Sequence, residues 1–171
     1  MSIRILPKVG IEIATAFEVQ FKMPREEVHN LLGEPSGIRR AILSNDSSHP
    51  PELWKYDGWR IEIEYCDTIE QVLAITVEQL VHSQKPESNV WLNDVSVFDL
   101  KATELLKIVK NLDPTVKIDS IGFDSPVLGI CMYCNDFEEA CAYPFLGPEF
   151  DYFNPERHDV VSSITLFGER P

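Results

Sequence analysis

The sequence has no long apolar run and few basic residues. No stretch approaches the roughly 18 consecutive apolar residues of a membrane-spanning helix, so we expect no span. Only 15 Lys and Arg stand against 28 Asp and Glu, which gives a formal net charge of -13 at pH 7. Nucleic acids and anionic membranes are bound mainly through Lys and Arg. The composition therefore argues against both as partners.

An export signal and a disulfide framework are also missing. The start, "MSIRILPKVGIEI", has no charged region followed by an apolar region and a cleavage site, so the expected compartment is the cytoplasm. Four cysteines in 171 residues, without an export signal, are expected to be free thiols. Cys131 and Cys134 have the spacing of half a zinc knuckle, but in a strand they would point to opposite faces. We predict no metal site and no cofactor.

Recognisable catalytic motifs are absent from the sequence. It contains no G-x-S-x-G, H-E-x-x-H or phosphate-binding loop. His29 is expected on the exposed side of a helix, away from any nucleophile. Glu26 and Glu27 fall in the first turn of that helix, where the helix dipole already favours negative charge. We predict a protein that is not an enzyme, with no catalytic residues.

What the sequence does contain begins with a short helix in "KMPREEVHNLLGEP", residues 22–35. Pro24 is suited to its first position, and Gly33 is suited to the position just after its end. Val28, Leu31 and Leu32 form one apolar stripe. A helix of about ten residues is unstable alone, so it is expected to pack on a sheet.

Two strictly alternating segments follow the helix, "WRIEIEYCD" (59–67) and "QVLAITVEQ" (71–79). This alternation predicts a hairpin with one buried and one solvated face. The buried face is expected to contain Ile61, Ile63, Tyr65, Leu73, Ile75 and Val77. The solvated face is expected to contain Arg60, Glu62, Glu64, Ala74, Thr76 and Glu78.

The same pattern returns 77 residues later. Phe98 opens "FDLKATELLKIVKNL", which predicts a second helix, and strand-like segments follow at 127–136 and 160–169. The similarity favours a duplicated α-β-β unit, with chance similarity of two amphipathic helices as the alternative. We expect an α+β fold with one antiparallel sheet and both helices on one face. The units would be residues 1–80 and 81–171, in one compact domain.

Residues 8–80 resemble a known family, and residues 90–168 do so more weakly. "MPREEVHNLLGEP" followed by "ELWKYDGWRIEIEY" is similar to the helix-hairpin module of β-lactamase inhibitory protein and of SmpA/OmlA-type lipoproteins. Tandem copies also resemble bacterial proteins of the toxin-immunity type. The resemblance implies a non-catalytic scaffold that binds another protein across its sheet.

The second unit differs from the first by an insertion, residues 136–158. It combines many acidic and aromatic residues, and aromatic anchors ringed by charge are typical of interface centres. The alternative is that the aromatic residues only pin this loop to its own sheet. A different hypothesis is a small-ligand protein or enzyme with a pocket under the loop.

We therefore predict a protein-binding module, of the kind that inhibits a basic toxin, with its oligomeric state left open. An acidic surface would steer a basic protein partner into contact. The predicted contact residues are Glu62, Glu64, Glu138, Glu139, Glu149, Asp151, Tyr152 and Phe153.

Overall fold

The computed structural model describes residues 2–14, 16–39, 50–56, 58–80, 90–134 and 161–168. Its helices are α1 (Arg25–Leu32) and α2 (Ala102–Leu112). The strands of the first half are β1 (Ile3–Leu6), β2 (Gly10–Ile13), β3 (Phe17–Gln20), β4 (Gly37–Ile38), β5 (Glu52–Tyr56), β6 (Trp59–Tyr65) and β7 (Val72–Gln79). Those of the second half are β8 (Val90–Leu92), β9 (Val95–Ser96), β10 (Lys117–Asp119), β11 (Gly122–Ser125), β12 (Ile130–Cys134) and β13 (Val161–Phe167).

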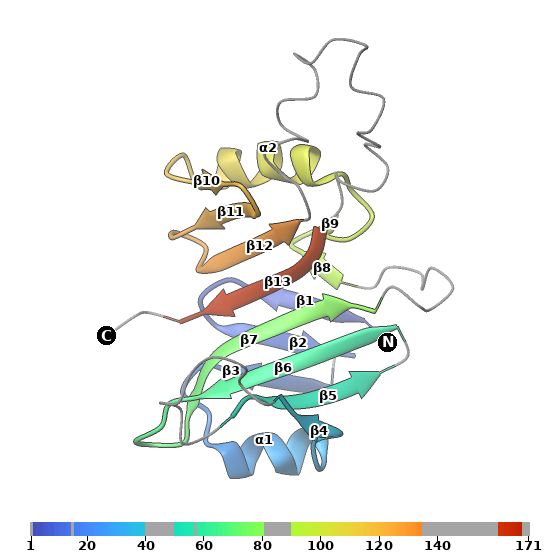
Figure 1. Cartoon of the computed structure of the whole chain (residues 1–171), viewed down its shortest axis with the longest axis vertical. Coiled ribbons are helices and arrows are strands. Elements are labelled where there is room, and N and C mark those ends of the chain that lie inside the picture. The colour runs from blue at the N-terminus through green and yellow to red at the C-terminus, as the bar shows by residue number, and fades with distance from the viewer. Residues whose placement is uncertain are drawn as a thin grey trace.

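The strands form two sheets that lie face to face (Figure 1). The smaller sheet has five strands in the order β3-β2-β1-β8-β9, and only its β1–β8 pair is parallel. The larger has eight strands in the order β10-β11-β12-β13-β7-β6-β5-β4, all antiparallel. Each half of the chain contributes strands to both sheets, so the halves share one structure.

The predicted fold class is wrong. The chain is mostly β, with two large sheets, and it is not an α+β fold of two α-β-β units. The prediction assumed a single sheet with both helices packed on one of its faces. In the structure β1, β2, β3, β8 and β9 form a second sheet, and this sheet provides most of the cover.

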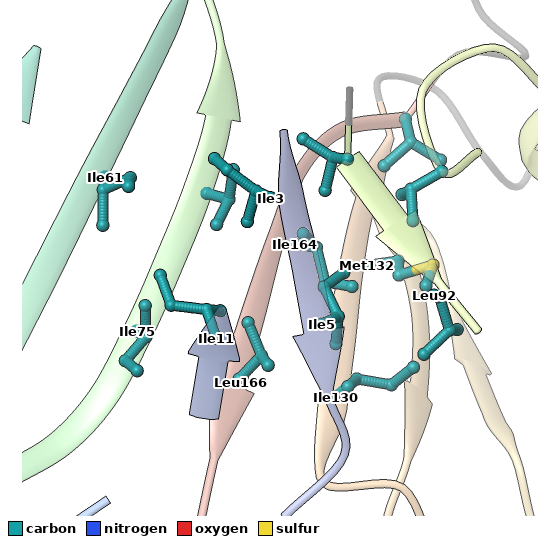
Figure 2. Close-up of a cluster of buried hydrophobic side chains, with 14 of the residues drawn as sticks. Ile3, Ile5, Ile11, Ile61, Ile75, Leu92, Ile130, Met132, Ile164 and Leu166 are labelled. Atoms are coloured by element: carbon teal, nitrogen blue, oxygen red, sulfur yellow. The ribbon is translucent and has the colours of Figure 1, made fainter. Parts of the chain in front are cut away.

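The core lies between the two sheets, as Figure 2 shows. Isoleucines of β1 and β2 point toward β-branched and other apolar side chains of the larger sheet. The labelled residues of this layer are all at most 1% exposed: Ile3, Ile5, Ile11, Ile61, Ile75, Leu92, Ile130, Met132, Ile164 and Leu166. β-Branched residues pack well on a pleated surface, so this composition suits a sandwich of two sheets.

The two helices lie at opposite ends of the molecule's long axis and do not share the middle of one face (Figure 1). α1 buries Val28 completely, whereas α2 buries Ala102, Leu105, Leu106 and Val109. The existence of both helices is confirmed, and Gly33 ends α1 with φ 77° as expected. Neither helix in the described part of the chain is long and apolar enough to cross a membrane.

The predicted hairpin is confirmed as β6 and β7, which pair antiparallel. One part of its inward pattern is wrong, because Leu73 is 48% exposed. The register shifts between Glu64 and Tyr65, so that Val72 lies opposite Tyr65 and Ala74 opposite Glu64. Leu73 is the extra residue of this irregularity, and Val72 takes the buried position in its place.

Two glycines lie where a neighbouring strand leaves no room for a side chain. At Gly10 (φ 149°) a Cβ atom would lie 1.9 Å from the carbonyl oxygen of Val19. At Gly122 (φ 155°) it would lie 1.9 Å from the carbonyl oxygen of Met132. Each glycine therefore permits a close approach between paired strands that no other residue could make without a shift of the backbone.

A buried aspartate fastens the end of α2 to the larger sheet. Asp113 directly follows α2 and is 0% exposed. Its carboxylate accepts hydrogen bonds from the hydroxyls of Thr115 and Ser125, both at 2.6 Å, and from the backbone amides of Thr115 and Val127. Burial acts to raise the pKa of Asp113, but these hydrogen bonds lower it to about 2.

Candidate functional site

The candidate surface is the outer face of the eight-stranded sheet, which is the side turned away from the smaller sheet (Figure 1). Strand register places Thr76 and Thr165 side by side at its centre, with their hydroxyls 2.8 Å apart. On the β5–β6 side the outer face carries Leu53, Lys55, Arg60, Glu62, Glu64 and Glu78. On the β10–β12 side it carries Lys117, Asp119, Asp124, Cys131 and Tyr133.

Glu62 is on the outer face, as predicted, but it is not freely solvated. Its side chain is 5% exposed, and Arg39 Nη1 donates to Oε1 at 3.2 Å and to Oε2 at 2.9 Å. The Arg39 side chain is itself 61% exposed. The expectation of an exposed Glu62 is wrong, because the arginine at the end of β4 neutralises it and its carboxylate is buried.

Glu64 lies two residues along β6 on the same face and has no such counter-ion. Among the described residues, none forms an ion pair or a hydrogen bond with its carboxylate. Burial and, after it, the charge of Glu62 raise the pKa of Glu64, and the charge of Arg39 only partly opposes them. Glu64 is therefore a half-buried carboxylate with no direct partner in the described chain, and the charge of Arg39 compensates it only in part.

A second polar cluster lies on the inner side, beneath α1. Glu52 of β5 is 1% exposed, and both its oxygens are occupied. Arg25 donates to Oε1 from Nε at 2.9 Å and from Nη2 at 2.5 Å, while His29 Nε2 lies 2.7 Å from Oε2. The Arg25 guanidinium also lies 5.8 Å from the ring centroid of Tyr65. The cluster attaches one face of α1 to the sheet.

The electrostatics of this cluster favour an ionised Glu52. Burial acts to raise the pKa of Glu52, but hydrogen bonds from His29 and Arg25 outweigh it and lower the pKa. The buried hydroxyl of Tyr65 has no hydrogen-bond partner in the described part of the chain. Burial and the charge of Glu52 raise the pKa of Tyr65, so this phenol stays neutral.

The His29–Glu52 pair has the residue types of a catalytic base and its orienting carboxylate, but its geometry is that of a structural clamp. Nε2 of His29 is used on Glu52, and Nδ1 faces Glu34 at 3.8 Å. The ring also packs edge-on against Trp54, whose indole donates to the Gly33 carbonyl at 3.1 Å. The expectation that His29 is on the exposed side of α1 is wrong, since its side chain is only 23% exposed.

Most of the predicted contact residues lie outside the described residues. The structure places Glu62 and Glu64 together on the outer face of β6. The others fall in the insertion, so the structure tests neither their role nor a pocket beneath residues 136–158: Glu138, Glu139, Glu149, Asp151, Tyr152 and Phe153. Sequence reasoning missed Arg39, Glu52 and Arg25, which determine how the charges of this end of the protein are paired.

The cysteines behave as expected in the part of the chain that the structure covers. Cys66, Cys131 and Cys134 are thiols that form no disulfide. Cys131 faces outward on β12 and is half-buried, whereas Cys134 is 2% exposed in the core. The prediction that these two side chains point to opposite faces is confirmed.

Comparisons of the chain with protein-family models, with curated proteins and with solved structures gave no significant match.

Proposed function

We propose that this protein is a non-catalytic binding module that takes a basic protein partner on the outer face of its eight-stranded sheet. The partner class we favour is a basic toxin, with this chain as its immunity-type inhibitor. The resemblance of residues 8–80 to inhibitory helix-hairpin modules supports this class, and the charge of -13 supports a basic partner.

The single observation that carries the proposal is that no described residue forms an ion pair or a hydrogen bond with the half-buried carboxylate of Glu64. A half-buried charge without a counter-ion costs free energy in the isolated protein. A Lys or Arg of a partner would form an ion pair with Glu64 and remove that cost. Because this ion pair exists only in the complex, it would favour binding. Arg39 Nη1 makes its two contacts with Glu62, at 2.9 and 3.2 Å, and the charge of Arg39 only partly opposes the effect of burial on Glu64.

The setting of Glu64 also suits a protein partner. The centre of the outer face is formed by short hydroxyl side chains, Thr76 and Thr165, with Glu62 and Cys131 to either side in the same row. A protruding loop or helix could lie along this central strip, with its basic residues directed at β6. The sequence adds a further seven acidic residues against one arginine between positions 135 and 160.

Capture from the native host tests the proposal. The protein is immobilised and exposed to host lysate at low and at high salt, and captured proteins are identified by mass spectrometry. We expect a basic protein that is retained at low salt and released at high salt, because exposed charge pairs are screened. The matched variants are Glu64→Gln on the outer face and Glu104→Gln, an exposed carboxylate on α2.

Glu64→Gln is expected to weaken capture of the same protein by about tenfold, the usual scale of one lost charge-assisted contact, while Glu104→Gln leaves it unchanged. Co-expression then tests inhibition, since the captured protein should impair growth alone and not beside the wild-type chain. No captured protein at either salt, or equal capture by both variants, would contradict the proposal.

A further inference from the structure

Among the described residues, no strand pairs with the outer edge of β10, at the far end of the eight-stranded sheet. β10 is the outermost strand beyond β11, and all three of its residues are exposed. Ile118 is 46% exposed, although its register partner Phe123 is buried at 1%. The side chain of Ile118 thus lies on the inner side of the sheet, but the core does not cover it. An open edge with an exposed apolar residue can pair with another strand.

The sequence of β10 is self-complementary about Ile118. If a second copy of β10 pairs antiparallel with the first across a twofold axis at Ile118, Lys117 lies opposite Asp119 of the second copy, and Asp119 opposite its Lys117. Lys117 has no ion pair within the described chain. Asp119 uses Oδ1 to accept the backbone amide of Ile121 at 2.9 Å, which leaves its other oxygen available.

The other sheet edges in the described structure are not self-complementary in charge. β4 has only Gly37 and Ile38, and β9 has only Val95 and Ser96, so neither carries an ionisable side chain. β3, with the sequence FEVQ, would place its single charge, Glu18, opposite Val19 in an antiparallel pair of two copies. Charge complementarity therefore selects β10 among the four edges.

We propose that two copies of this chain associate through β10, and that their eight-stranded sheets join into one continuous sheet. The twofold axis brings the two Ile118 side chains together on the inner face, and neighbouring apolar residues line the same end. Leu112, at the end of α2, is 44% exposed, and Ile121, after β10, is 53% exposed. Because β10 is short, this contact is small, and the dimer forms only at high protein concentration.

Cysteine crosslinking tests the axis directly. Ile118→Cys places two thiols directly opposite each other, with Cβ atoms roughly 5 Å apart, close to disulfide range. The matched control is Ile121→Cys, equally exposed, which the same register places opposite Thr115 of the second copy. Under mild oxidation, or with a short thiol crosslinker, we expect several-fold more covalent dimer from Ile118→Cys than from the control or the wild type.

Sedimentation of the uncrosslinked chain supplies the second measurement. The wild type should show a dimer fraction that rises with concentration up to about 1 mM, the range of small interfaces. Ile118→Lys puts two like charges on the axis, and Lys117→Asp sets Asp opposite Asp, so both variants should stay monomeric. Salt screens both the two Lys117–Asp119 pairs and the repulsion between chains that each carry a charge of -13. Exposed ion pairs contribute little, so the repulsion should decide and dimerisation should strengthen with salt, the opposite of the response proposed for a basic partner.

A wild type that stays monomeric, or equal crosslinking of the two cysteine variants, would overturn the inference. Association that continues past the dimer would overturn it too, since it would indicate pairing between two different edges. None of these outcomes depends on the outer-face variant Glu64→Gln, so the failure of this inference and the failure of the proposed function can be told apart.

Discussion

The Nε2 atom of His29 lies 2.7 Å from Oε2 of Glu52, and this contact joins α1 to β5 across 23 residues of sequence. Arg25, one turn earlier on the same helix, holds the other oxygen of Glu52. Two cationic or polar donors of one short helix thus converge on one buried carboxylate. Since α1 itself fully buries only Val28, this polar clamp carries much of its attachment.

Replacing Glu52 with Gln should destabilise the protein. The amide cannot accept both from Arg25 and from His29, and hydrogen bonds to charged groups contribute about 1.5–3 kcal/mol each, so we expect the free energy of unfolding to fall by that amount. Urea unfolding followed by circular dichroism measures it. The control is Glu26→Gln, an exposed carboxylate of the same helix, which should be neutral. Equal stability of the two variants would contradict the role of Glu52.

Asp113 should make the fold sensitive to acid. Its pKa is lowered from 3.8 to about 2 in the folded protein, so the unfolded chain binds its proton first as the pH falls. The stability that Asp113 contributes is present above pH 3.8 and is lost between that value and about 2. In Asp113→Asn this part of the acid dependence should vanish. Urea midpoints of both proteins across this range test it, and parallel pH profiles would refute it.

A methyl group at position 122 should be poorly tolerated. In Gly122→Ala the Cβ atom would lie 1.9 Å from the Met132 carbonyl oxygen, at a φ of 155° that other residues rarely adopt. We expect a loss of roughly 3 kcal/mol or more from strain and overpacking. Gly37→Ala is the matched control, because no atom of the described residues, apart from its own chain neighbours, lies within 4 Å of its Cβ position. Thermal unfolding of both variants measures the difference, and equal unfolding temperatures would contradict the prediction.

Glu64→Gln should stabilise the isolated protein while it weakens partner binding. The raised pKa of Glu64 means that the folded chain holds this proton more tightly than the unfolded chain, so ionisation at neutral pH costs stability. Removing the charge should raise the free energy of unfolding by less than about 1 kcal/mol, since the group is partly solvated. The gain should disappear at low pH, where the wild-type carboxyl is protonated. A destabilised variant would instead show that Glu64 has a structural role.

The alternating and helical segments were predictable from sequence because their periodicity reports burial directly. Residues 59–67 and 71–79 form the predicted hairpin, and the helices fall within the predicted stretches. The second sheet was not predictable in this way. Segments such as "IRIL" and "GIEI" indicate strands. Their pattern does not identify the neighbouring strands, and it does not show that they form a sheet that covers another sheet.

One signal for the Glu52 cluster was present in the sequence. In "ELWKY" the apolar alternation places Trp54 and Tyr56 on one face, and Glu52 shares it. A carboxylate at an inward position requires a partner, so the segment indicated a buried ion pair. The partners Arg25 and His29 lie on a distant helix, and only the tertiary structure identifies them. Glu62 was misjudged for the same reason, because Arg39 lies at the end of a different strand.

The position of β13 has a consequence for the order in which the chain can be assembled. Residues 161–167 come last among the strands, yet they lie in the interior of the larger sheet, between β12 and β7. During synthesis, the β4–β7 and β10–β12 groups must wait with unpaired inner edges until this segment leaves the ribosome. The final strand then joins them in a single step. A nascent chain arrested before residue 161 would expose the unpaired edges of β7 and β12, and unpaired strand edges are prone to aggregation.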